Sequence, residues 1–394
     1  MAARHVKGGH PSDSGFCLPW GDLWRGKVRN AMTNLLFARF TPKTLEPKDS
    51  IGAKWPRLLD QLDLARAVSG KRTAIKMHLG GASGFSTIHP FFVRKLVEKV
   101  KAAGAKEVFV TDSPDAVLHA AERGYTAEAL GCNLVPVTGT ADRYFYKQAV
   151  EPAFLSLNEV ELAGEIVDAE AMIDFSHVKG HGDCGFGGAS KNLSMGCVTG
   201  RTRGKIHGLE GGLEWDRRKC KLCNICMENC PNRAIRFRES KFSVFYHHCK
   251  LCRHCVLICP QKALKMVGGR YKDFQQGMAI TTSKVLKTFA PGNVVFINML
   301  MDITIFCDCW GMTQHALVPD IGILAGRDIV AIETASLDMI RTRDLIPGTL
   351  PAKLELGKKG HLFERIHGKD PHAVIGFLAK LGHGTKQFKL TEVE

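Results

Sequence analysis

The sequence predicts an α/β fold, a mostly parallel wound sheet into which a small α+β unit is inserted. Short apolar strands alternate with helical segments from about residue 70 onward, as is typical of parallel sheets covered by helices. The alternation stops over 213–270, which is rich in cysteine and basic residues, and resumes afterwards. With 394 residues, 45% of them hydrophobic, the chain is long enough for two or three domains and is not disordered as a whole.

We therefore expect four segments along the chain. Residues 1–50 form a variable N-terminal extension, 51–212 the first part of the α/β domain, 213–270 the insertion and 271–394 the second part of the α/β domain. Both boundaries of the insertion fall in polar segments that contain glycine, and such segments suit the crossing points of an inserted unit.

The extension contains a basic amphipathic stretch over 23–40. Its apolar side chains recur at roughly helical spacing, and its charged side chains are all basic: Arg25, Lys27, Arg29 and Arg39. The sequence predicts a helix here, which either packs on the protein itself or makes peripheral contact with an anionic membrane surface. Of these two, we favour packing on the protein.

Each element of the α/β pattern has its own signal. Short apolar runs predict strands, and Pro90 in the first turn and Gly104 after the last turn bracket the first long helix. The predicted strands lie over 72–79, 106–111, 133–137, 171–175 and 293–300, and the helices over 89–103, up to about 123, 329–340 and 371–381.

The cysteine content and the hydropathy indicate a location in an anaerobic or reducing cytoplasm. The longest apolar stretch, 293–307, contains Asn298 and Asp302 and is too polar for a transmembrane helix. The N-terminus has no apolar signal region. We expect the 14 cysteines of such a chain to bind metal more than to form disulfides.

Eight cysteines form two runs of identical spacing, C-x2-C-x2-C-x3-C-P, within the insertion. This is the pattern of bacterial two-cluster ferredoxins, in which the fourth cysteine of each run ligates the other run's cluster. Zinc sites usually pair two C-x2-C units, so the doubled runs favour iron–sulfur over zinc. The predicted ligands of two [4Fe–4S] clusters are Cys220, Cys223, Cys226 and Cys259 for one, and Cys249, Cys252, Cys255 and Cys230 for the other.

Several further motifs resemble one known family. They are KMHLGG at 76–81, VTDS at 110–113, SHVKGH at 176–181, GFGGASKNLSMGC at 185–197, CDC at 307–309 and VPDIGILAGRDIVAIETASLDMI at 318–340. Over about 70–392 the chain resembles the DUF362 group of iron–sulfur proteins, whose members often have this inserted ferredoxin module. The resemblance implies the cluster-binding insertion but names no substrate.

Polar residues follow the predicted strands at the ends where ligands bind in open α/β sheets. Each alone is more often structural, but together they predict one convergent site. We expect His78, His177, Lys179 and His181 to be catalytic, and Lys76, Asp112, Lys191, Asn192 and Asp302 to bind substrate.

The segment 181–195 is rich in glycine and matches neither a Walker loop nor a dinucleotide fingerprint, because Ser190 stands where each needs glycine. It is either a backbone nest for another anion or a tight connection. Four further cysteines are buried filler, a third metal site or a reactive thiol: Cys184 and Cys197, which flank this segment, and Cys307 and Cys309, whose spacing can chelate a soft metal.

The insertion has 13 Lys and Arg against 4 Asp and Glu, in a chain with a net charge of +15. A basic surface steers acidic partners, so we expect an acidic electron carrier such as ferredoxin or flavodoxin. Nucleic acid is the less favoured partner, because the sequence has no helix-turn-helix, aromatic RNA-binding motif or zinc finger.

These observations favour an iron–sulfur oxidoreductase that passes electrons through two clusters to a small anionic substrate or a cofactor at the strand ends. Two alternatives stay open: an electron-transfer protein without a substrate of its own, and a metal- or cofactor-handling protein that uses the remaining cysteines.

Overall fold

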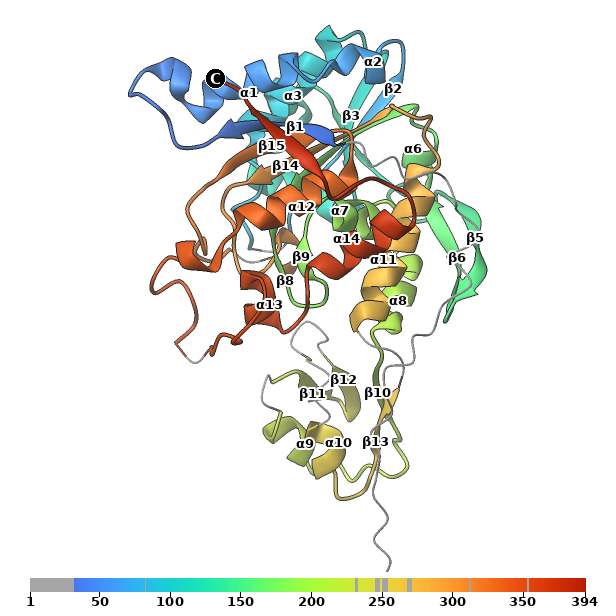
Figure 1. Ribbon diagram of the computed structural model, residues 1–394. Helices are drawn as coiled ribbons and strands as arrows, with labels where there is room; N and C mark the ends of the chain where they lie inside the picture. The colour runs from blue at the N-terminus through green and yellow to red at the C-terminus, as the bar shows by residue number, and fades with distance from the viewer. Residues whose placement is uncertain are drawn as a thin grey trace, which may run out of the picture.

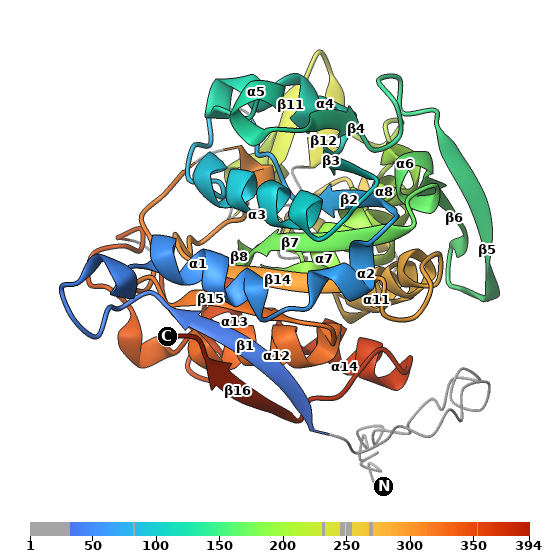
Figure 2. The same cartoon turned by 90° about the horizontal axis from the view of Figure 1, so that it is seen from above.

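The computed structural model describes residues 32–81, 83–230, 233–244, 249, 254–267, 271–311, 313–352 and 354–394. Among them, eight strands form one sheet in the order β16-β1-β15-β14-β7-β2-β3-β4 (Figures 1 and 2). Its strands are β1 (Thr33–Arg39), β2 (Arg72–Lys76), β3 (Glu107–Asp112), β4 (Asn133–Pro136), β7 (Ala171–His177), β14 (Val294–Leu300), β15 (Gly322–Gly326) and β16 (Phe388–Glu392).

Every neighbouring pair in this sheet is parallel except the two that involve β15. The prediction of a mostly parallel α/β sheet is therefore confirmed. The strands and helices predicted for the α/β domain from residue 70 onward are present, although β2 ends at Lys76, three residues early. The sequence analysis did not predict β1, β15, β16 or the hairpin of β5 (Phe145–Phe154) and β6 (Leu157–Ala163).

Helices cover both faces of the sheet, as Figure 1 shows with α1 to α3 above it and α11, α12 and α14 below it. The two faces bury separate hydrophobic clusters. One face packs α1 (Ile51–Asp60), α2 (Leu64–Val68), α3 (Pro90–Ala102), α4 (Pro114–Leu118) and α5 (Ala127–Leu130). The other packs α6 (Gly164–Val167), α7 (Ala189–Gly196), α8 (Gly200–Leu209), α11 (Tyr271–Leu286), α12 (Ile329–Met339), α13 (Leu362–His367) and α14 (His372–Lys380).

The predicted amphipathic helix is wrong over 33–39, which is the strand β1 between β15 and β16. Leu35 and Phe37 pack on one face of the sheet, and Leu36 and Ala38 pack on the other. A short run of consecutive apolar residues is the pattern of a strand buried on both faces, and it also matches helical spacing over a few residues. This part has no apolar helical face for a membrane, and residues 23–31 lie outside the described ones.

The inserted segment folds as a small unit at the ends of α8 and α11, below the sheet in Figure 1. Its core contains Ile235 and Leu264 together with Cys226 and Cys255. Its elements are β10 (Gly212–Trp215), α9 (Ile225–Glu228), β11 (Ile235–Arg238), β12 (Lys241–Val244), α10 (His254–Ile258) and β13 (Leu264–Val267). The antiparallel pair β10–β13 joins the unit to the two helices.

The glycine-rich segment forms the hairpin of β8 (Lys179–His181) and β9 (Gly185–Gly187) and then enters α7. A Cβ atom on Gly180 would collide with the carbonyl oxygen of Ile305, and Gly185 has a φ of 84°. These glycines are needed for close packing and for a left-handed backbone, as in a tight connection. Within the described part of the chain, helices fall short of the length and apolar character that a membrane crossing needs.

Candidate functional site

The carboxyl ends of β2, β3 and β7 open into a cavity of about 350 Å³, a volume within the range of small-molecule sites. Its other walls come from β9, α7, the segment 307–309, α8 and α11. The predicted site residues that line it are Lys76, His78, Asp112, His177, His181, Lys191, Asn192, Cys307 and Cys309.

Lys76 and Asp112 form a buried ion pair at the ends of β2 and β3. Lys76 Nζ lies 2.9 Å from Asp112 Oδ1 and 2.7 Å from Asn192 Oδ1, and His78 Nδ1 lies 2.6 Å from Asp112 Oδ2. Burial by itself would raise the pKa of Asp112, but Lys76 and His78 hold it well below its ordinary value. The ionised carboxylate therefore fixes two side chains of the cavity wall.

Asp308 is the centre of a second buried network. Its carboxylate accepts from Lys179 Nζ at 2.7 Å and pairs with His177 Nδ1 at 2.9 Å. Lys179 also donates to the carbonyl oxygen of Ser86 at 2.7 Å, and His177 Nε2 lies 2.7 Å from the carbonyl oxygen of Met301. Against the effect of burial, His177 and Lys179 hold the pKa of Asp308 well below its ordinary value.

This network changes the roles predicted for two residues. Both ring nitrogens of His177 face oxygen acceptors, and Lys179 is buried outside the described lining of the cavity. The geometry therefore suits these residues to positioning the segment 307–309 more than to proton transfer. Asp308 was not predicted as a site residue, although its place between two candidate cysteines could have identified it.

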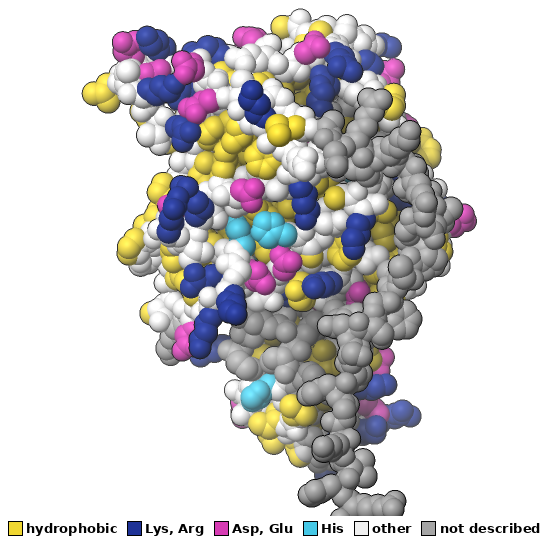
Figure 3. Space-filling model, viewed as in Figure 1, with side chains coloured by type: hydrophobic (Ala, Val, Ile, Leu, Met, Phe, Trp, Pro, Cys, Tyr) yellow, Lys and Arg dark blue, Asp and Glu magenta, His cyan; other side chains and the backbone are white. Residues whose placement is uncertain are grey.

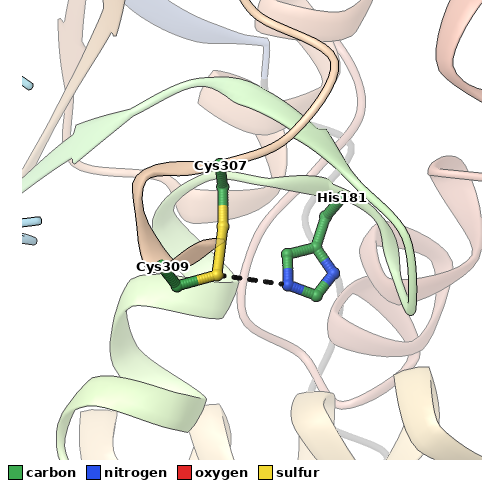
Figure 4. Close-up of side chains that lie close together, drawn as sticks. All are labelled: His181, Cys307 and Cys309. Atoms are coloured by element: carbon green, nitrogen blue, oxygen red, sulfur yellow. Dashed lines mark hydrogen bonds between the residues drawn. A yellow bond between two sulfur atoms is a disulfide. The ribbon is translucent and has the colours of Figure 1, made fainter. Parts of the chain in front are cut away.

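A group of sulfur and nitrogen atoms lies at one side of the cavity (Figure 4). Cys307 and Cys309 are joined by a disulfide. Lys191 Nζ lies 3.5 Å from Cys307 Sγ and 3.3 Å from Cys309 Sγ, and His181 Nε2 lies 3.6 Å from Cys309 Sγ. Among the residues that the structure describes, His181, Cys307 and Cys309 are the group whose ligand atoms lie close enough to hold one metal ion, within 4.8 Å of one another.

Three other predicted residues do not join this group. Cys184 and Cys197 are fully buried, and burial raises the pKa of the Cys197 thiol to about 12. The Cys184 thiol donates to the carbonyl oxygen of Phe186 at 3.0 Å. Asp302 is exposed, and its backbone N–H donates to Asp320 at 2.7 Å, away from the described lining of the cavity.

Figure 3 shows histidine side chains close together at the middle of one face of the molecule. Outside the lining of the cavity, the rings of His361, at the start of α13, and His372, at the start of α14, lie 5.7 Å apart. His361 accepts from the backbone N–H of Phe363 and contacts the carbonyl oxygen of Leu337, so both of its nitrogens have partners within the fold. Burial lowers the pKa of His361 to about 4, as expected for a neutral, structural histidine.

Two buried carboxyl groups support α7, the helix that contains Lys191 and Asn192. Glu333 accepts from the backbone N–H of Ser190 at 2.9 Å, in the first turn of α7. Asp174, in the central strand β7, accepts from Asn192 Nδ2 at 2.5 Å. Burial raises the pKa of Glu333 to about 8 and that of Asp174 to about 7.

Replacing Glu333 by glutamine should make stability less dependent on pH between about pH 5 and pH 8. The folded protein keeps a proton on Glu333 that the unfolded chain releases, because the pKa of this side chain is about 8 only when buried. The wild-type protein therefore loses stability as the pH rises through this window, on the order of 3 kcal/mol from this group. Thermal unfolding of both proteins at several pH values measures the difference.

The control for this prediction is Glu98→Gln on the surface of α3. Its hydrogen bonds with Lys95 and Arg94 lower the pKa of Glu98, so it titrates below the window. This control should follow the wild-type curve. A Glu333→Gln protein with the wild-type slope would show that Glu333 is ionised in the folded state across this range.

The cysteines of the inserted unit approach one another across the two runs. Burial raises the pKa of Cys226. The neighbouring cysteines raise it further: Cys259 first, then Cys220 and Cys223. These four cysteines line one small cavity. Burial and then Cys249 and Cys230 raise the pKa of Cys255 to about 11. Cys252 lies outside the described residues.

The two runs make equivalent local hydrogen bonds, each within its own run. The sulfur of Cys230 accepts from the backbone N–H of Ala234 at 3.2 Å, and the sulfur of Cys259 accepts from that of Ala263 at 3.3 Å. Cys226 lies in α9 and Cys255 in α10, and these helices pack together. Backbone donors that point at sulfur stabilise thiolates, the form in which cysteine binds metal.

Comparison with known proteins adds a family and two solved structures. A protein from Thermotoga maritima is similar with a TM-score of 0.34 and 10% identity over 66% of this chain and 52% of its own. The lactate racemase apoprotein from Thermoanaerobacterium thermosaccharolyticum is similar with a TM-score of 0.29 and 12% identity over 69% of this chain and 51% of its own. The chain thus spans about half the length of each. No curated protein matches it.

The family is identified over most of the α/β body. The model of the domain of unknown function DUF362 matches residues 73–338, which include β2, β3, β7, β14, α7 and the inserted unit. Since the match covers more than half of the sequence, the chain belongs to the DUF362 family.

Proposed function

We propose that the protein is an iron–sulfur oxidoreductase. The inserted unit would hold two [4Fe–4S] clusters, and the cavity at the strand ends would bind the electron acceptor or donor. The observation that carries the proposal is the approach of Cys259 to the cysteines of the first run and of Cys230 to those of the second. Crossed ligation of this kind is typical of two-cluster ferredoxins.

The arrangement of these cysteines favours a cluster over zinc. Four thiolates around one zinc ion lie at about 2.3 Å from the metal, so their sulfurs are close to one another. Among the described residues, no three cysteines of the inserted unit have sulfurs close enough together to hold one ion, whereas the ligand atoms of His181, Cys307 and Cys309 are that close. Four of the cysteines in the inserted unit, Cys220, Cys223, Cys226 and Cys259, line one shared cavity instead, as the ligands of one cluster would.

The connection between the inserted unit and the cavity favours an enzyme over a simple electron carrier. The helix α8 leads into β10, the first strand of the inserted unit. The helix α11 follows β13, the last strand of that unit. The same two helices supply Arg203, His207 and Phe274 to the wall of the cavity. A ligand in the cavity would therefore lie beside the two helices from which the inserted unit extends. The positive charges of Lys191 and Arg203 suit a small anionic ligand. The basic unit itself suits an acidic carrier such as ferredoxin or flavodoxin.

Anaerobic purification followed by iron, sulfide and metal analysis tests the cluster assignment. We expect about eight irons and about eight sulfides per chain, and electron paramagnetic resonance signals of reduced [4Fe–4S] clusters. A Cys132→Ser variant, which changes a cysteine outside the runs, should keep all of the iron. Stoichiometric zinc with little iron would contradict the proposal.

The role of the cavity is tested separately by mass spectrometry of small molecules released from the purified protein. An organic ligand that is retained by the wild-type protein and lost in Arg203→Met, with the iron content unchanged, would support an oxidoreductase with its own substrate. Partner binding that depends on redox state, with no retained ligand in either protein, would favour the electron carrier.

A further inference from the structure

We propose that Cys307 and Cys309 are a redox-active dithiol–disulfide pair that exchanges two electrons with the ligand of the cavity. The pair lies in the cavity wall, and its two sulfurs are joined in the structure. This inference deepens the proposed function, because the clusters of that proposal are the one-electron carriers that would supply it. The chemistry of the pair itself rests on the side chains around the sulfurs.

Lys191 stabilises the reduced pair. Its ammonium lies 3.5 Å from Cys307 Sγ and 3.3 Å from Cys309 Sγ, so a thiolate on either sulfur would have a cation beside it. A lysine next to a cysteine favours the thiolate, which is the reactive form.

His181 is oriented to donate a hydrogen bond to sulfur. Its Nδ1 accepts from the backbone N–H groups of Asp183 at 3.1 Å and Cys184 at 3.4 Å. A backbone N–H only donates, so Nδ1 presents its lone pair and the ring proton sits on Nε2. That N–H points toward Cys309 Sγ at 3.6 Å. A metal ligand at Nε2 would need the lone pair there, so this tautomer favours dithiol chemistry over metal binding.

The segment that contains both cysteines is held rigidly. Asp308 stands between them, and its carboxylate is fixed by Lys179 and His177. Gly187 leaves room beside the pair, since a Cβ atom at this position would lie 3.4 Å from Cys307 Cβ and 3.3 Å from Lys191 Cδ. The two sulfurs can therefore meet or separate by side-chain movement while the backbone keeps its place.

In the proposed reduction, the reduced clusters supply two electrons, one at a time, and are themselves oxidised. The S–S bond breaks. The sulfur of Cys309 takes a proton from the solvent, and the Nε2–H group of His181 donates a hydrogen bond to that sulfur. The sulfur of Cys307 stays a thiolate beside Lys191. In the reverse direction the S–S bond forms and the pair delivers two electrons and one proton to a reducible ligand in the cavity.

Differential alkylation of the full chain, as purified anaerobically, tests this proposal. The protein is treated with the mild thiol oxidant diamide, incubated anaerobically with or without dithiothreitol, alkylated with iodoacetamide and digested with trypsin. The peptide 288–327 contains Cys307 and Cys309 and no other cysteine. We expect it to be unalkylated and lighter by two hydrogens before reduction, and doubly alkylated after it.

The variants Lys191→Met and His181→Asn distinguish chemistry from packing. In Lys191→Met, the reduced pair should be alkylated about tenfold more slowly near pH 7, with its pH profile moved to higher pH. His181→Asn should slow reduction by dithiothreitol at constant pH. Lys147→Met is the matched control, because Lys147 pairs with Glu159 on the exposed hairpin of β5 and β6 and should leave both rates unchanged.

Two results would overturn the proposal. One is double alkylation without reduction after oxidant treatment, which would show that the pair does not close. The other is a metal ion retained in stoichiometric amount and lost in Cys307→Ser or Cys309→Ser, which would make the group a metal site. The reductant in this test is chemical, so a protein that failed the iron analysis would still give a clear answer here.

Discussion

Replacing Asp308 by asparagine should lower the free energy of unfolding by about 3–5 kcal/mol. The carboxylate is buried and lies 2.7 Å from Lys179 Nζ and 2.9 Å from His177 Nδ1. Asparagine has nearly the same size but no charge, so it leaves a buried ammonium without its counter-ion. Breaking such a pair costs more than the pair contributes, because the remaining charge is not solvated. Chemical unfolding of the full chain, followed by circular dichroism, measures the loss.

A second substitution identifies the cause of this loss. In the double variant Asp308→Asn with Lys179→Met, the unpaired ammonium is gone, and part of the stability should return. The matched surface control is Asp344→Asn, which removes a carboxylate that pairs with Arg341 at 2.8 Å near solvent, and it should change stability little. Equal effects of the buried and the surface substitution would contradict a charged network at Asp308.

Replacing Cys259 by alanine should remove about half of the iron, and the lost cluster should belong to the first run of cysteines. The reason is the position of Cys259 beside Cys226, Cys220 and Cys223, although it follows them by a whole repeat in the chain. Three thiolates hold a cubane poorly, because the fourth iron is left open to solvent. Iron analysis and electron paramagnetic resonance of the reduced variant measure the loss.

Pairs of substitutions show which cluster each cysteine serves. The double variant of Cys259→Ala with Cys220→Ala should lose no more iron than either single variant, since both residues would ligate the same cluster. Cys259→Ala with Cys249→Ala should lose nearly all of the iron. The opposite pattern, with additive loss in the first pair, would show that each run ligates its own cluster.

Much of the α/β body could be predicted because its signals are local. The strands that became β2, β3, β4, β7 and β14 are short apolar runs between turn residues, and α3 has proline at its start. The strand β1 was mistaken for a helix because four consecutive buried residues fit both the two-residue period of a strand and the 3.6-residue period of a helix. The strand β15 also lies in a short apolar run, IGILAG at 321–326, but no local pattern shows that it is antiparallel to its neighbours, since strand direction depends on which strands it meets.

The candidate site was predicted in part for the same reason. Lys76 ends β2 and His78 follows it two residues later, and both meet Asp112 at the end of β3. Asp302 follows a strand as well, but the chain turns there with a φ of 47° and leaves it exposed. Asp308 gave no periodic signal, because a single carboxylate in a loop becomes important only when buried cations surround it.

The sequence by itself determined the repeated cysteine spacing, the family motifs and the alternation of strands and helices, since these depend on residues close together in the chain. Only the tertiary structure decided that Lys191 lies over Cys307 and Cys309, that Asp308 neutralises Lys179, and that α8 and α11 line the cavity. These contacts join residues far apart in the chain. Their partners are chosen by which elements pack together to bury apolar surface, and no local pattern records that choice.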